Sequence, residues 1–269
     1  MTARAVIAFD YSGTLSTGAV DFGRSDRLQA ALERSGLAAF GVDTPAVYWQ
    51  RVVAPTWPAA SITARPFSQY IVDQVLGLAP PGAPPVPAVV AAAGRFVASY
   101  LAASVVAPPW RPLVRRLCCR HDLRVIVATD HYAEATEAII GHLAALGLSG
   151  APLAAAASAP RDVRVANSAD LGCRKTDPSY WRKVASAVGG KPAAVILVDD
   201  FGAGERGASG YAAREAAARR KQLTAQALRA AGDWTVRVYA VAPADGGVSA
   251  LAAVVAAVED VIREALSDR

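Results

Sequence analysis

The chain has 269 residues, a hydrophobic fraction of 53% and a formal net charge of +5, with a pI of about 9.3. This length suffices for one large domain, or for a core with a smaller second domain. The mild basic excess suits an anionic substrate. It does not predict nucleic-acid binding, because the basic stretch at 214–229 has no interleaved aromatic residues and is typical of a solvated helix face.

We predict a cytoplasmic protein without a membrane partner. No apolar run reaches the roughly 18 residues that a membrane-spanning helix needs. Asp10 closes the first apolar run after five residues, which is too short for the core of a signal peptide. The three cysteines have no metal-site spacing and are interpreted as unpaired thiols in a reducing compartment; they are Cys118, Cys119 and Cys173.

Short apolar runs of strand length alternate with helical patterns along much of the chain. Strands are expected at residues 5–9, 124–128, 193–198 and 235–241. Helices are expected between or after them, at residues 132–146, 178–188, about 211–230 and 248–266. This alternation predicts an α/β fold with a Rossmann-like, mainly parallel sheet covered by helices on both faces.

Residues 17–107 carry helical patterns without a convincing strand. We predict that they form a helical cap inserted after the first strand, so that the α/β core consists of residues 1–16 and 108–269. A proline-rich loop at residues 79–87 interrupts the insertion. The cap helices are expected at residues 26–39, 45–53, 67–76 and 88–105.

Four short motifs stand at predicted strand ends or in adjoining loops. In chain order they are D-Y-S-G-T from Asp10 to Thr14, V-A-T-D ending in Thr129-Asp130, G-C-R-K ending in Lys175, and V-D-D ending in Asp199-Asp200. The carboxyl ends of parallel strands meet at one edge of a sheet, where α/β proteins carry their chemistry. We therefore expect these side chains to lie close together.

The acidic residues of these motifs predict a Mg²⁺ site. Asp199 and Asp200 offer an oxygen-rich site for a hard cation beside Asp10. Gly13 allows a tight turn, through which Asp10 and the backbone carbonyl of Ser12 can face the same cation. The expected metal ligands are therefore Asp10, Ser12, Asp199 and Asp200.

The remaining motif residues predict a site for a phosphoryl group. A carboxylate that attacks an anionic phosphate needs positive charge nearby, and Lys175 supplies part of it. The hydroxyl of Thr129 and the backbone N–H groups at Thr129-Asp130 are suited to hold phosphate oxygens. The expected substrate-binding residues are Ser12, Gly13, Thr129, Asp130 and Lys175.

In type, order and spacing, these motifs resemble the four motifs of the haloacid dehalogenase (HAD) superfamily. That family places its nucleophilic Asp in D-x-D-G-T after the first strand, a Ser or Thr after the second, a Lys in a following loop, and an acidic pair after the fourth. Those places are occupied here by Asp10, Thr129, Lys175 and Asp199-Asp200. The segment L-G-C-R-K-T-D-P-S-Y-W also resembles the family's G-x-x-K-P-x-P-x-x-F, with Thr176 replacing the first Pro.

The resemblance covers about residues 4–15 and 108–245, and the predicted insertion matches the family's cap only in placement and helicity. It implies a Mg²⁺-dependent hydrolase whose catalytic residues are Asp10, Thr129 and Lys175. In this role Asp10 attacks phosphorus, and the substrate is a small phosphorylated molecule. Nothing in the sequence identifies the substrate or the oligomeric state.

Position 12 departs from the family pattern, because Ser12 stands where ordinary members have a second Asp. There that Asp protonates the leaving oxygen and later activates water, a contribution of roughly 10²–10⁴-fold. Family branches without it include P-type ATPases with long-lived phosphoenzymes and phosphonoacetaldehyde hydrolases with a cap lysine. The predicted cap has no lysine, since the first in the chain is Lys175. We expect a phosphatase that favours good leaving groups, such as acyl or aryl phosphates.

Two alternatives stay open. One is metal-free dehalogenation by Asp10 through an ester intermediate, which the acidic pair at 199–200 disfavours. The other is a catalytically impaired relative that binds a phosphorylated ligand or a protein partner, which Ser12 favours.

Several other residues have two interpretations. Tyr48, Trp49 and Trp57 are interpreted as the core of the cap, with a shelf for the substrate as the alternative. His131 is expected at the surface or in a structural role, although its place beside the second motif would also suit the pocket. Arg174 is expected at the surface, with a second phosphate contact as the alternative.

Overall fold

A computed structural model describes residues 4–78, 85–155, 162–188, 192–204, 214–242 and 247–267. Its centre is a six-stranded sheet with the order β3-β4-β2-β1-β5-β6, in which neighbouring strands run parallel. The strands are β1 (Ala5–Phe9), β2 (Leu123–Thr129), β3 (Gly150–Pro152), β4 (Val163–Asn167), β5 (Ala194–Asp199) and β6 (Thr235–Ala240). The predicted α/β class with a Rossmann-like parallel sheet is confirmed.

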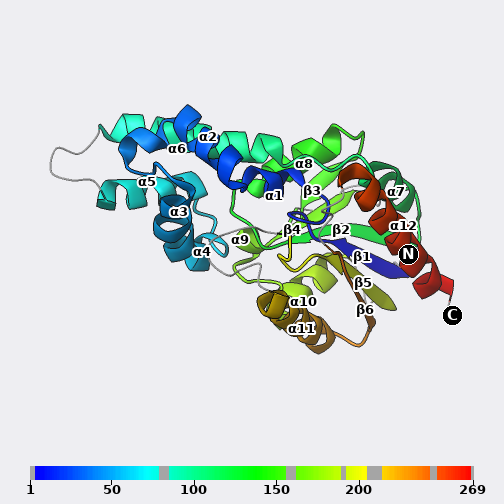
Figure 1. Ribbon diagram of the computed structural model, residues 1–269. Helices are drawn as coiled ribbons and strands as arrows, with labels where there is room; N and C mark the ends of the chain where they lie inside the picture. The colour runs from blue at the N-terminus through cyan, green and yellow to red at the C-terminus, as the bar shows by residue number, and fades with distance from the viewer. Residues whose placement is uncertain are drawn as a thin grey trace.

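Helices cover both faces of this sheet (Figure 1). They are α7 (Trp110–Cys118), α8 (Ala135–Ala144), α9 (Ser168–Leu171), α10 (Pro178–Ala187), α11 (Arg214–Ala231) and α12 (Gly247–Ser267). Side chains alternate along β1, so that Ile7 and Phe9 pack in a cluster with residues of α7, α8 and α12. Val6 and Ala8 pack in a second cluster with residues of α10 and α11. Burial on both faces explains why this central strand is a continuous apolar run.

Strands β3 and β4 are not expected from the sequence, and the structure corrects that omission. β4 pairs with β2 and β3, and its Val163 and Val165 are buried while Arg164 is half-buried. Because Arg164 interrupts the apolar residues, no continuous run marks the strand. β3 is only three residues long and contains Pro152, which suits its place at the edge of the sheet.

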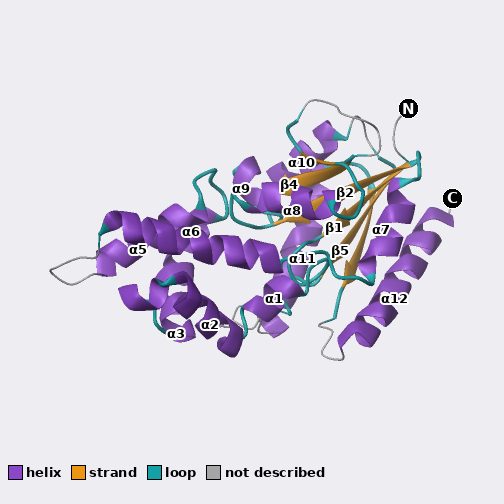
Figure 2. Ribbon diagram, turned by 90° about the horizontal axis from the view of Figure 1, so that it is seen from above, coloured by secondary structure: helices purple, strands orange, loops and turns teal. Residues whose placement is uncertain are grey.

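A helical segment, residues 18–103, follows the turn after β1. Its helices are α1 (Gly18–Phe22), α2 (Ser25–Ser35), α3 (Pro45–Val47), α4 (Ala54–Ala60), α5 (Phe67–Leu78) and α6 (Val86–Ala103), with a 3-10 turn at Leu37–Phe40 and a π-helical stretch at Tyr48–Val53. The segment extends away from the sheet on the side opposite to the chain termini (Figures 1 and 2). It has its own hydrophobic cluster, which includes Leu32, Ile71 and Phe96. We retain residues 17–107 as the proposed extent of a cap; residues 79–84 of the expected proline-rich loop lie outside the described chain.

Helix α6 has the length and composition of a membrane-spanning helix, with a mean hydropathy of 1.5 over 18 residues. The expectation that no apolar run of the chain is long enough to span a membrane is therefore wrong for this helix. In the structure, α6 packs against α2 and α5, with Val89, Ala92 and Phe96 buried in the cluster of the helical segment. This one-sided burial is typical of a helix that forms the core of a folded unit.

Hydrogen bonds join the helical segment to loops beside the carboxyl edge of the sheet. The carboxylate of Glu134 accepts from the backbone N–H groups of Phe67 (2.8 Å) and Ser68 (3.0 Å), at the start of α5. A negative charge at a helix N-terminus is favourable. The guanidinium of Arg174 donates to Oγ of Ser61, just after α4, at 2.9 and 3.1 Å. The segment is thereby positioned over the ends of β1 and β2.

Candidate active site

The turn after β1 places Asp10 at the carboxyl edge of the sheet, between β2 and β5. The backbone N–H of Asp10 donates to the carbonyl of Val198 at 2.8 Å, and the residue is 5% exposed. Gly13 has a φ of +80°, and a Cβ atom there would lie 2.3 Å from Oδ2 of Asp200. Glycine is therefore required at this point, as both the positive φ and the close approach show. Thr14 completes the turn, because its Oγ1 accepts from the backbone N–H of Asp200 at 3.0 Å.

Lys175 lies at the centre of the predicted site residues. Its Nζ donates to Oδ1 of Asp10 and to Oδ2 of Asp199, at 2.7 Å in each case. Its backbone is held on both sides: Asp130 accepts from its N–H at 2.9 Å, and the indole N–H of Trp181 donates to its carbonyl at 2.8 Å. The structure thus brings together all four motifs, which lie up to 189 positions apart, from Asp10 to Asp199.

Buried carboxylates outnumber the ammonium group at this centre. Burial, together with repulsion from Asp199 and Asp200, raises the pKa of Asp10 well above its usual value, against the attraction of Lys175. Burial and repulsion from Asp199 also raise the pKa of Asp200, to about 6. Burial alone would lower the pKa of Lys175, but Asp10, Asp199 and Asp130 outweigh it and raise that pKa well above its usual value. The cluster has an excess of negative charge that a further cation would relieve.

Three of these acids fit a hard cation. One carboxylate oxygen each from Asp10, Asp199 and Asp200 lies within 4.8 Å of the others, and all three residues are buried. The loop that follows holds the carboxylate of Asp200 in place. Its Oδ1 accepts from the N–H of Gly202 (3.0 Å), and its Oδ2 accepts from the N–H of Gly204 (2.9 Å). An all-oxygen, carboxylate-rich donor set suits Mg²⁺ and does not suit a soft metal.

A polar cavity of about 40 Å³ adjoins this centre, and all the acidic and basic residues just described line it. Thr129 lies on its wall, and the Oγ1 atom of Thr129 is buried without a hydrogen-bond partner among the described residues. A buried hydroxyl without a partner is energetically unfavourable, and a ligand with acceptor oxygens would supply that partner. By volume, the cavity has room for about three water-sized groups.

Three further residues with polar side chains, which were not anticipated as site residues from the sequence, line the polar cavity: Thr176, Arg220 and Thr224. The Nε of Arg220 donates to the carbonyl of Phe201 at 2.7 Å, directly after the acidic pair. The prediction that the basic stretch at 214–229 forms a solvated face is therefore wrong for Arg220. Helix periodicity identifies a face, but only the packing of α11 on the sheet determines which residues reach the site.

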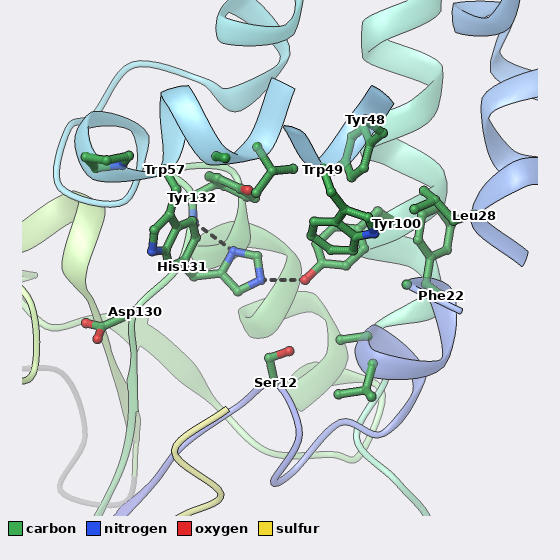
Figure 3. A pocket seen from close by; sticks show the side chains of 16 residues that line it. Ser12, Phe22, Leu28, Tyr48, Trp49, Trp57, Tyr100, Asp130, His131 and Tyr132 are labelled. Carbon is green, nitrogen blue, oxygen red and sulfur yellow. Dashed lines mark hydrogen bonds between the residues drawn. The ribbon is translucent and has the colours of Figure 1, made fainter. Parts of the chain in front are cut away.

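A second, larger cavity of about 200 Å³ shares Ser12 and Asp130 with the polar cavity (Figure 3). Tyr48, Trp49 and Trp57 line it, as the alternative interpretation of these residues anticipated. The remaining lining comes mainly from α1, α2, α4, α6, the π-helical stretch and the loop after β2. The two cavities therefore adjoin at Ser12 and Asp130, and together they suit a molecule with one polar end and one apolar end.

His131 faces the larger cavity and is 4% exposed. Its Nδ1 accepts from the N–H of Tyr132 at 2.8 Å, and its Nε2 lies 3.1 Å from the hydroxyl of Tyr100. Arg174 lines neither cavity, because its guanidinium is bonded to Ser61. The alternative interpretation of Arg174 as a phosphate contact has no support in this geometry.

Comparison with solved structures establishes the fold. A protein described as a predicted HAD-like family hydrolase from Porphyromonas gingivalis superposes with a TM-score of 0.54 at 11% identity, over 98% of this chain and 99% of that chain. The chain has the HAD-like fold. The resemblance inferred from the four motifs is thereby confirmed at the level of the fold.

A HAD family enzyme from Bacteroides thetaiotaomicron gives the same result. One of its structures has a TM-score of 0.50 at 10% identity, over 92% of this chain and 97% of that chain. Another, an aspartate-to-alanine variant in complex with magnesium and inorganic phosphate, has a TM-score of 0.51 at 11% identity, over 92% and 98%. No family model and no curated protein matches the sequence.

Proposed function

We propose that this chain is a Mg²⁺-dependent hydrolase that removes the phosphoryl group from a small phosphorylated molecule by way of Asp10. The observation that carries the proposal is the contact between Asp10 and Lys175 beside a polar cavity lined by Thr129. The complex of the Bacteroides enzyme with magnesium and inorganic phosphate supports the same chemistry. Because the fold hosts several reactions, these site residues and not the fold are the argument.

The reaction would proceed in two displacements at phosphorus. Oδ2 of Asp10, the oxygen not bonded to Lys175, attacks phosphorus, and the bond to the leaving oxygen breaks with its electron pair. Water then attacks the aspartyl-phosphate, which releases inorganic phosphate and restores the carboxylate. Lys175 orients Asp10, and with the hydroxyl of Thr129 it binds phosphoryl oxygens. The backbone near Ser12, Gly13 and Asp130 would complete the contacts to the phosphoryl group.

Asp10, the carbonyl of Ser12, Asp199 and Asp200 are the groups that would hold Mg²⁺. A bound Mg²⁺ neutralises charge on the phosphoryl group and so lets the carboxylate approach it. The same charge would relieve the repulsion that raises the pKa values of Asp10 and Asp200.

A screen of phosphorylated metabolites with and without Mg²⁺ tests this proposal. We expect hydrolysis of at least one compound, and a fall of at least about tenfold in excess chelator that added Mg²⁺ reverses. Asp199→Asn combined with Asp200→Asn should abolish the response to Mg²⁺. Full activity in chelator, with halide released from haloacids, would instead favour the metal-free dehalogenase. Tight binding of phosphorylated ligands without turnover would favour the impaired relative.

Ser12 predicts slow turnover of substrates with poor leaving groups. Its side chain lines both cavities but cannot act as a general acid near neutral pH. We expect Ser12→Asp to raise the steady-state rate for an alkyl phosphate by up to about 10²-fold, and that for an acyl phosphate less, because an acyl phosphate needs no protonation of its leaving oxygen.

Ser12→Asn is the matched control, since it has the size of Asp without the acid. It should not reproduce the gain. A wild-type enzyme that cleaves alkyl phosphates as fast as acyl phosphates would contradict this prediction. Another group would then supply the proton.

A further inference from the structure

The cavity of about 200 Å³ is where the leaving group of a substrate would lie. Ser12 and Asp130 line both this cavity and the polar cavity that holds Asp10 and Lys175. A substrate with its phosphoryl group at Asp10 therefore extends past Ser12 into the larger space. Figure 3 shows Ser12 on one side of that space and the aromatic side chains of the helical segment on the other.

Aromatic side chains line this cavity, which we call the aromatic pocket. They are Phe22, Tyr48, Trp49, Trp57, Tyr100 and Tyr132. Several pack edge to face, among them Tyr48 with Trp49, at a centroid distance of 5.2 Å, and Trp57 with Tyr132, also at 5.2 Å. Such walls favour a flat, apolar guest, because aromatic rings prefer offset and edge-to-face contacts.

The described residues of the aromatic pocket provide no positive charge to pair with an anionic ligand. No lysine or arginine is among the described residues that line it, and Asp130 is its one acidic residue. His131 is neutral, since burial lowers its pKa to about 4. Because its Nδ1 accepts from Tyr132, its proton is on Nε2 and is donated to the hydroxyl oxygen of Tyr100. An anionic leaving group would lose its hydration here without gaining a counter-charge.

We propose that the aromatic pocket binds the ring of an aryl phosphate monoester, with one uncharged aromatic ring and at most a short substituent. This inference rests on the proposed phosphatase function and names its substrate class. The size fits, since an apolar cavity of about 150 Å³ accommodates benzene and this one is about 200 Å³. Nucleotides and sugar phosphates are excluded by size, charge or the desolvation of their hydroxyl groups.

The chemistry of Ser12 agrees with this substrate class. A phenolate is a stable leaving anion, so the phosphoryl group transfers to Asp10 without a proton from residue 12. The electron pair of the breaking P–O bond stays on the phenolate oxygen, which takes a proton from solvent after release. An aryl ester is therefore compatible with both unusual features of the site: it needs no acid at position 12, and its ring can pack against the aromatic side chains.

The first test compares kcat/KM for a panel at saturating Mg²⁺: phenyl phosphate, 4-carboxyphenyl phosphate, acetyl phosphate and glucose 6-phosphate. Phenyl phosphate should exceed 4-carboxyphenyl phosphate by at least about tenfold, although the carboxylated ring is no worse a leaving group, because the pocket lacks a counter-charge. It should exceed glucose 6-phosphate by about 10²-fold or more. Equal values for phenyl and 4-carboxyphenyl phosphate would overturn the proposal.

The second test replaces an aromatic residue that lines the aromatic pocket. Trp49→Leu should lower kcat/KM for phenyl phosphate about tenfold more than for acetyl phosphate, which has no ring to bind. Trp234→Leu is the matched control: Trp234 is also half-buried, but it packs in the cluster under α10 and α11 and should affect neither substrate. An equal loss for both substrates in Trp49→Leu would show only a structural role and would reject the pocket.

The binding of phenylphosphonate, which is not hydrolysed, separates this inference from the proposed function. Calorimetry should give tighter binding than for methylphosphonate, by at least about tenfold, in the wild type but not in Trp49→Leu. If acetyl phosphate is hydrolysed and the two phosphonates bind equally well, the proposed phosphatase function is supported and the binding of a ring in the aromatic pocket is rejected. If no phosphate ester is hydrolysed but phenylphosphonate binds more tightly than methylphosphonate, the binding of a ring in the aromatic pocket is supported and the proposed phosphatase function is rejected.

Discussion

Asp10→Asn should lower turnover by at least about 10³-fold, the scale seen when other enzymes lose a nucleophile. An amide is a poor nucleophile at phosphorus and a weaker ligand for a hard cation. The fold should survive, because Lys175 keeps its bond to Asp199 (2.7 Å) and the substitution removes one of three mutually repelling carboxylates. Steady-state rates on the best substrate of the screen, with circular dichroism to verify folding, measure the effect.

Asp73→Asn is the matched control for this variant. Asp73 is an exposed aspartate of the helical segment that pairs with Arg65, at 2.6 Å, and it lines neither cavity. Its substitution should leave the rate within about twofold of the wild type, because exposed ion pairs contribute little. Activity of Asp10→Asn within about tenfold of the wild type would reject Asp10 as the nucleophile.

Lys175→Met should destabilise the metal-free protein by about 3–5 kcal/mol, the usual result of leaving buried charges without their partner. The substitution removes the ammonium group that contacts Asp10 and Asp199. Without it, the pKa of Asp10 in the folded state, which burial already raises, rises further above its value in the unfolded chain because the attraction of Lys175 is lost. A group whose pKa is raised on folding stabilises the folded state when the pH is below its pKa in the unfolded chain. That stabilisation is lost as the pH rises through its pKa in the folded state.

The variant should therefore lose more stability relative to the wild type at pH 8 than at pH 5. Denaturant unfolding in chelator at the two pH values measures the difference, and added Mg²⁺ should restore part of it. Lys183→Met is the control, since the Nζ of Lys183 donates to a backbone carbonyl, that of Leu171, away from the acidic cluster. A loss that is the same at both pH values, or no larger than that of Lys183→Met, would mean that Lys175 does not neutralise the acidic cluster.

The central sheet and the position of its chemistry follow from simple patterns in the sequence. β1 and β5 are buried on both faces, so they are continuous apolar runs; Asp10 directly follows β1, and Asp199 is the last residue of β5. Parallel pairing then aligns Phe9 with Val198 and brings Asp10 and Asp199 to one edge. The sequence alone therefore predicts that these distant residues meet at one edge of the sheet.

Other parts of the molecule depend on packing that a single sequence does not encode locally. β4 carries Arg164 between its buried valines, so alternation over five residues is its only sign. Arg220 is one of several basic residues on a single helix, and only the packing of α11 determines that it reaches the site. Likewise, Trp49 and Trp57 are apolar residues on short helical stretches, and their arrangement around one cavity depends on how the helical segment lies over the sheet.

Acid-quench trapping of the phosphoenzyme is the most direct test that Asp10 is the nucleophile. The wild type is mixed with ³²P-labelled acetyl phosphate and Mg²⁺, quenched within milliseconds to seconds, and assayed for label bound to protein. We expect label on one peptide that contains Asp10, released by hydroxylamine as is usual for an acyl phosphate, and absent from Asp10→Asn and from samples in chelator. Ser12 predicts that this label accumulates, because dephosphorylation lacks the usual base. Rapid turnover with no label on Asp10, or label that persists in Asp10→Asn, would contradict the assignment of Asp10 as the nucleophile.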